Sequence, residues 1–235
     1  MSANDFALVQ GMSDTRATLR RWNDRPWPAI RSWVAGAAAV AVALLGCVWV
    51  LASVARPDLT PIYLAGVAGV PVGPMDVAAI LFRNSLVLSL HAMACVAGFI
   101  AGSSLALAAT RRQGLSKWVH EKARPIAFAW VIAATGFSLA TQAYVLGSDG
   151  ATISNQLEIS PAVLVVTVLP HALPELTALF LPLAAWTIAS RREGWDELLA
   201  ATFATTALAI PVLIVAASWE AFIWPRILEL VSPVV

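Results

Sequence analysis

The stretch that decides the fold is residues 161–190, PAVLVVTVLPHALPELTALFLPLAAWTIAS. It is apolar enough to enter a lipid bilayer, yet it carries His171 and Glu175 in its interior. As one straight helix it would rise about 45 Å, which exceeds a hydrocarbon thickness of about 30 Å. Pro170 and Pro174 each lack a backbone N–H and disfavour helical geometry in the residue before them. We therefore expect this span to be broken or kinked at the two prolines.

The composition of the whole chain indicates a membrane protein. Hydrophobic residues make up 59% of its 235 residues and charged residues only 12%, whereas a soluble domain carries about 25% charged residues. The formal net charge of +1 provides no basic surface for nucleic acid, so we expect no nucleic-acid partner. Cys47 and Cys95 both lie in apolar segments, where packing is the expected role.

Five apolar segments are long enough to span a bilayer, and the fold class they predict is an all-α polytopic helical bundle. The segments are 33–55, about 76–109, about 125–146, 161–190 and about 198–224. Residues 56–76 are rich in proline and glycine and predict an interfacial or re-entrant loop, and 147–160 predict a polar outer loop. The domain division is a basic, amphipathic tail over residues 1–31 and a single transmembrane helical domain over 32–235.

The placement of arginine and lysine predicts the orientation. Twelve of the 15 basic residues lie in the tail, in the loop at 111–124 and in the pair at 191–192. Because basic residues gather on the cytoplasmic side, the N-terminus is expected in the cytoplasm and the C-terminus outside. The predicted location is therefore the cytoplasmic membrane.

This orientation brings several polar side chains of different spans to one depth, in the outer half of the membrane. They are Arg83, Asn84, His91, His171, Glu175 and Glu220. Ionisable groups at this depth are costly unless they have partners, so we expect one intramembrane polar cluster. Three interpretations stay open: hydrogen bonding that pins the helices together, a path for a substrate, lipid or proton, and a metal site.

The other motifs concern packing and catalysis. Gly98 and Gly102 form a GxxxG pair that predicts a close helix contact. The sequence has no GxSxG, Walker A or CxxC motif, so we expect neither enzymatic activity nor a cofactor.

Two segments resemble the stage II sporulation protein M family. They are LPHALPEL at 169–176 and AASWEAFIWP at 216–225, which match the family's LPHGxxEL-like and AxxIEAFxTP-like motifs in order. RNS at 83–85, the glycines at 98 and 102, and Gln113 with Gly114 are similar to weaker positions of the family. When the motifs are matched in this way, the polar positions of the family correspond to Asn84, His171, Glu175 and Glu220. Ala172 stands where the family usually has glycine.

The resemblance implies a non-enzymatic membrane scaffold or anchor that organises peptidoglycan remodelling or membrane-protein partners. Partners of the kind it implies are membrane lipid, RDD-type membrane proteins, a MoxR-type ATPase and wall hydrolases. The alternative is a permease-like transport component whose outward-facing polar site takes a small solute, ion or lipid. Small residues on the first three spans suit a homodimer and internal packing equally.

Overall fold

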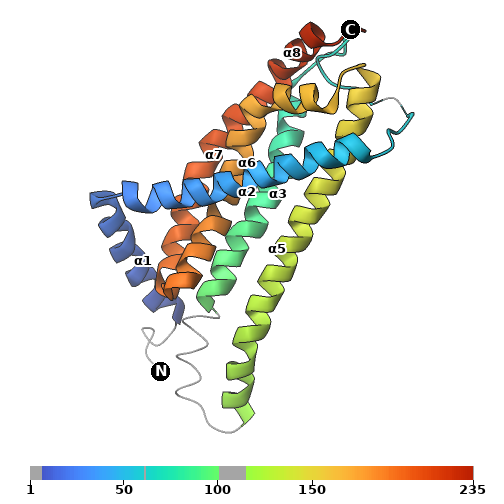
Figure 1. Ribbon diagram of the computed structural model, residues 1–235. Helices are drawn as coiled ribbons and strands as arrows, with labels where there is room; N and C mark the ends of the chain where they lie inside the picture. Colours follow the sequence, from blue (N-terminus) through green and yellow to red (C-terminus); the bar gives the residue numbers. More distant parts are fainter. Residues whose placement is uncertain (1–6, 61, 101–114, 235) are drawn as a thin grey trace. The chain divides into compact units, whose positions relative to one another are not determined.

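The described part of the chain folds into helices and the segments that connect them. The computed structural model describes residues 7–60, 62–100 and 115–234, and it contains no strand over these ranges. The helices are α1 (Ala7–Asp24), α2 (Trp27–Val54), α3 (Pro74–Phe99), α5 (Leu115–Gln156), α6 (Pro161–Arg192), the short 3-10 helix η3 (Trp195–Glu197), α7 (Leu198–Phe222) and α8 (Trp224–Val231) (Figure 1). Within these ranges, five helical segments are long and apolar enough to cross a membrane. The predicted all-α bundle with five spans is confirmed.

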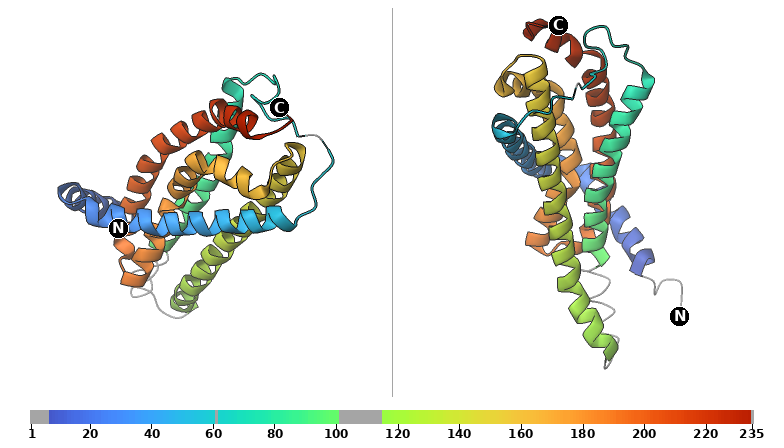
Figure 2. Two further views of the ribbon diagram at one scale, coloured as in Figure 1. Left: turned by 45° about the horizontal axis from the view of Figure 1, so that its top comes forward. Right: turned by 90° about the vertical axis from the view of Figure 1, so that its right-hand side faces the viewer.

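The prediction of a polar outer loop at 147–160 is wrong over most of its length. Helix α5 continues to Gln156, and Figure 2 shows it as one unbroken ribbon from green to yellow. Gly147 and Gly150, which resemble turn residues in the sequence, face α2 at close range. A Cβ added at Gly147 would lie 2.5 Å from Leu51 Cβ, and one at Gly150 would lie 3.4 Å from Ala52 Cβ. These glycines serve a close helix contact.

Helix α6 runs without interruption from Pro161 to Arg192, so the predicted break at Pro170 and Pro174 is wrong. The helix bends instead, where its ribbon passes from gold to orange in Figure 1. A bend opens the backbone enough to accommodate each proline ring while the other backbone hydrogen bonds of the helix persist. The bent but continuous helix agrees with a kink, which the sequence offered as the alternative to a break.

The connection between α2 and α3 is irregular, as its proline and glycine content predicts. Gly66 and Gly69 adopt positive φ angles of 83° and 79°, which a residue with a Cβ rarely adopts. Gly66 also lies against Pro225 at the start of α8, where an added Cβ would be 2.9 Å from the proline ring. The loop therefore packs closely on α8.

Close contacts between Cα atoms group the chain into two units. The first unit comprises residues 1–37, 88–136 and 179–208, and the second comprises 38–87, 137–178 and 209–235. Phe180, Leu179, Leu198 and Cys95 are fully buried in the first unit. In the second unit one buried cluster contains Val67, Leu157, Leu164 and Leu228, and another contains Ile80, Ala217 and Ala221.

Candidate functional site

Four polar side chains from three helices meet in the second unit. Arg83 and Asn84 lie on α3, Glu175 on α6 and Glu220 on α7. Glu175 interacts electrostatically with Glu220, Asn84 and Arg83, and Glu220 also interacts with Arg83. The structure thus brings together four of the six side chains that depth alone had assigned to one cluster. We call these four residues the polar cluster.

The polar cluster has a buried side and an open side. Asn84 is 8% exposed, the two glutamates are half-buried, and Arg83 is exposed. Two carboxylates next to one guanidinium leave one negative charge uncompensated when both are ionised, and burial makes such a charge costly. The cluster is therefore suited to taking up a proton, a cation or a donor group of another molecule.

Several buried polar atoms at and near the polar cluster have no hydrogen-bond partner among the described residues. They are Asn84 Nδ2, Glu175 Oε2, Trp219 Nε1 and His171 Nδ1. The side chain of Asn84 lies beside that of Glu175, but Asn84 Nδ2 and Glu175 Oε2 do not form a hydrogen bond of normal geometry with each other. Each unsatisfied buried group costs about 1–3 kcal/mol, so the arrangement favours a bound water, ligand or partner side chain that completes it.

His171 lies one turn before Glu175 on α6 and contacts an aromatic ring. Its ring centroid is 5.7 Å from that of Trp224 at the start of α8. Trp224 Nε1 donates a hydrogen bond to Thr167 Oγ1 at 3.1 Å, and the Thr167 hydroxyl donates to the Leu164 carbonyl at 2.7 Å. His171 and Thr167, four residues apart on one helical face, thus hold the first turn of α8 against α6.

The sequence reasoning missed Thr167, Trp219 and Trp224 as members of this region. The spacing of Thr167 and His171 was an available signal, because residues four apart share a helix face. The two tryptophans flank Glu220 in the segment WEAFIWP, and each carries an indole N–H that needs a partner when buried.

His91, the last of the predicted members, belongs to the first unit. It is fully buried, and its ring lies edge-on to that of Phe180, with centroids 5.3 Å apart and an interplanar angle of 77°. Its membership of the cluster stays a prediction.

The predicted packing glycines have different outcomes. Gly98 is buried against α6, where an added Cβ would lie 2.6 Å from Trp186 Nε1, and it also faces Leu198 Cδ1 at 2.9 Å. A residue with a Cβ at this position would therefore require the Trp186 and Leu198 side chains to shift. Gly102, Gln113 and Gly114 lie outside the described residues.

The metal interpretation finds no matching geometry in the described ranges. No group of three or more His, Cys, Asp or Glu side chains in residues 7–60, 62–100 and 115–234 is arranged to hold a metal ion. The polar cluster instead offers two carboxyl groups and a nearby amide, and such a set binds protons, water or hydrogen-bond donors.

Residues 123–225, a little under half of the chain, match the family model described as SpoIIM, stage II sporulation protein M. Over this segment the chain is similar to the SpoIIM family. No curated protein and no solved structure matches it in the corresponding comparisons.

The SpoIIM match covers α6, α7 and most of α5, and it ends at Pro225 in the first turn of α8. His171, Glu175 and Glu220 lie inside it. Arg83, Asn84 and Gly98, which the sequence resemblance had also used, precede the matched segment. The contacts of α3 with the matched segment therefore rest on the structure: Asn84 lies beside Glu175, and Gly98 faces Trp186.

Proposed function

We propose that this protein is a SpoIIM-type, non-enzymatic scaffold in a bacterial inner membrane, with its N-terminus in the cytoplasm and its C-terminus outside. In this role it gathers membrane or envelope proteins, such as RDD-type membrane proteins, a MoxR-type ATPase or wall hydrolases. The observation that carries the proposal is the continuity of α6 through His171 and Glu175. Transporter sites are typically built on discontinuous helices, whose free backbone groups bind the substrate.

The open side of the polar cluster gives the scaffold a contact point within the membrane. Arg83 is exposed on α3, while Asn84 Nδ2 and Glu175 Oε2 are buried without a hydrogen-bond partner in the described part of the chain. A polar side chain on a transmembrane helix of a partner protein would satisfy such groups, because hydrogen bonds between helices stabilise association in lipid. The same contact would join two copies of this chain in a homodimer.

Affinity purification in mild detergent tests the scaffold. The wild-type chain is compared with Arg83→Leu/Asn84→Leu, and Arg226→Leu, an exposed arginine on α8, serves as the matched control. We expect a wall hydrolase or membrane-protein partner to copurify with the wild type and the control, and to be lost with the double variant. Recovery of the same proteins with all three would overturn the role given to the polar cluster.

A second candidate function is a permease-like transport component, and the unsatisfied polar atoms favour it. Four buried groups without a hydrogen-bond partner among the described residues could be satisfied by a small solute, an ion or a lipid headgroup. Glu175→Ala separates the two functions. In a scaffold the change lowers the amount of protein in the membrane, whereas in a transporter it abolishes flux at normal abundance.

A further inference from the structure

Two hollows in the first unit share one wall. The wall consists of Trp22, Ala29 and Trp33, at the corner where α1 ends and α2 begins. The rings of Trp22 and Trp33 meet edge to face, with centroids 5.0 Å apart and an interplanar angle of 80°. This aromatic pair gives the corner a fixed shape, and one hollow opens on each side of it.

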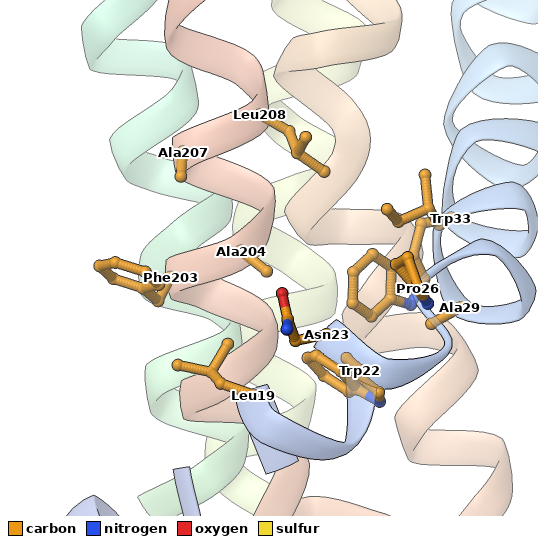
Figure 3. Close-up of a pocket in the computed structure, with 11 residues that line it drawn as sticks. Leu19, Trp22, Asn23, Pro26, Ala29, Trp33, Phe203, Ala204, Ala207 and Leu208 are labelled. Carbon is orange, nitrogen blue, oxygen red and sulfur yellow. The ribbon is translucent and has the colours of Figure 1, made fainter. Parts of the chain in front are cut away.

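The first hollow is an apolar groove of about 260 Å³ between the α1–α2 corner and α7. Figure 3 shows Leu19, Trp22 and Asn23 of α1 facing Phe203, Ala204, Ala207 and Leu208 of α7. Asn23 contributes the only polar side chain of this lining, and Phe203 and Leu208 are exposed. The α7 residues that line it, from Phe203 to Leu208, lie five to ten residues after the helix start at Leu198, or about 8 to 15 Å along the axis, so the groove lies within the apolar span. It has the character of a hydrocarbon site.

The second hollow, of about 290 Å³, is charged. Arg25, Ser32, Arg192 and Glu197 are among its lining residues. Arg21 Nη2 donates to Glu197 Oε1 at 3.3 Å, so the glutamate already has a cationic partner. In the described part of the chain no ion pair engages Arg25 or Arg192. We call this hollow the arginine pocket, because its excess charge is positive.

We propose that the two hollows together bind one anionic phospholipid, with its phosphate in the arginine pocket and an acyl chain in the apolar groove. A phospholipid is an amphiphile in which a phosphate and a hydrocarbon chain are joined at a short distance, and two hollows that share a wall match this arrangement. Guanidinium groups bind phosphate oxygens through paired N–H donors. The tryptophans at this corner, including the exposed Trp27, are the residues typical of the membrane interface.

The basic residues around the site favour an anionic lipid over a zwitterionic one. Exposed Arg16 and Arg20 on α1 add to the positive charge of this end of the chain. Clusters of this kind next to a transmembrane helix attract anionic headgroups of the cytoplasmic leaflet. The site is separate from the polar cluster of the second unit, so it stands independently of the proposed scaffold or transport role.

Native mass spectrometry of the full-length chain in detergent tests the proposal. Phosphatidylglycerol and phosphatidylcholine with identical acyl chains are titrated separately. We expect one phosphatidylglycerol to bind more tightly than phosphatidylcholine, and Arg25→Gln/Arg192→Gln to weaken its binding by about tenfold. Arg56→Gln/Arg226→Gln removes the same charge from residues of the second unit that line neither hollow, and it should leave binding within about twofold of the wild type. Equal binding of the two lipids, or an equal loss in both double variants, would overturn the site.

The acyl chain has its own test. Ala207→Phe places a ring in the apolar groove, whereas Val215→Phe enlarges an exposed position of α7 outside it. We expect the first variant to reduce phosphatidylglycerol binding and the second to leave it unchanged. Glycerol phosphate, which has the headgroup chemistry without the chain, should bind much more weakly than the lipid. Unchanged binding to Ala207→Phe, or equal affinity for glycerol phosphate, would show an anion site without a lipid. Circular dichroism of each variant before titration verifies its helical fold.

Discussion

The two halves of α6 are stabilised in different ways. Residues 179–186, in the first unit, are all buried, so that this part of the helix is surrounded by protein on every side. Residues 161–178, in the second unit, bury one face, which carries Leu164, Thr167 and His171, while Val166 and Pro170 are exposed. The contrast teaches that close packing stabilises the C-terminal half of α6. The N-terminal half depends on the hydrogen bonds and charges of its one buried face, because its other face is exposed.

The largest effect should come from the packed half. Phe180 is fully buried, and Phe180→Ala is expected to lower the free energy of unfolding by about 3–5 kcal/mol, because the cavity removes packing contacts on all sides. Phe137→Ala on α5 is the control, since that ring is 75% exposed and its loss should change stability by less than about 0.5 kcal/mol. Reversible unfolding in lipid–detergent micelles measures both. Equal effects in the two variants would contradict the contrast between packed and open helix surfaces.

Each unit has a glycine in a close helix contact, so the stability lost on replacing that glycine by alanine can be compared between the two units. Gly147→Ala in the second unit would place its Cβ 2.5 Å from Leu51 Cβ and 3.4 Å from the Val48 carbonyl, atoms that move only with the α2 backbone. Gly98→Ala in the first unit meets the side-chain atoms of Trp186 and Leu198, which can rotate. We expect about 1–3 kcal/mol of destabilisation, larger for Gly147→Ala.

The control for both glycine variants is Gly136→Ala, which has open space around the added methyl group. It should stabilise α5 by up to about 1 kcal/mol, because alanine favours the helix. Thermal unfolding followed by circular dichroism ranks the three variants. A larger loss for Gly98→Ala than for Gly147→Ala would reverse our account of which contact is rigid.

A smaller effect is expected where α6 meets α8. Trp224→Phe keeps an aromatic ring against His171 but removes the hydrogen bond to Thr167, at an expected cost of about 1 kcal/mol. Trp219→Phe is the matched control, because Trp219 Nε1 is buried and has no hydrogen-bond partner among the described residues. Its replacement should be neutral or stabilising in the unfolding measurement. A loss as large as that of Trp224→Phe would mean that a bound molecule satisfies Trp219.

Sequence reasoning predicted the spans and the meeting of Glu175 with Glu220, because both depend on properties that the sequence contains directly. Hydrophobic length fixes the spans, and the cost of a buried charge requires a partner at equal depth. The extent of α5 was not predictable in this way. Gly147 and Gly150 favour a turn when the local sequence is considered alone. The helix continues through them because α2 approaches closely there, and this contact is not visible in the sequence.

The two α6 prolines show a similar limit. Whether Pro170 and Pro174 interrupt a helix or bend it depends on the surrounding packing, which determines whether the remaining backbone hydrogen bonds persist. The ring contact between Trp224 and His171 requires the turn at residue 223 that starts α8 against α6, and this turn is a tertiary feature. Local pattern gives the element types, whereas the contacts between elements decide where each element ends.

The smallest expected effect concerns a polar contact at the surface of the second unit, and it depends on pH. In the loop after α2 the Asp58 carboxylate accepts a hydrogen bond from the Thr60 N–H at 2.8 Å, which lowers the pKa of Asp58 below its ordinary value of 3.8. The turn is therefore fully stabilised above pH 3.8, and this stabilisation is lost as the pH falls through the lowered pKa. We expect the hydrogen-exchange protection factor of the Thr60 amide to decrease over that interval. Asp58→Asn retains an acceptor oxygen without a titrating group, so its protection should stay constant with pH; a parallel decrease in this variant would show that the loop opens for another reason.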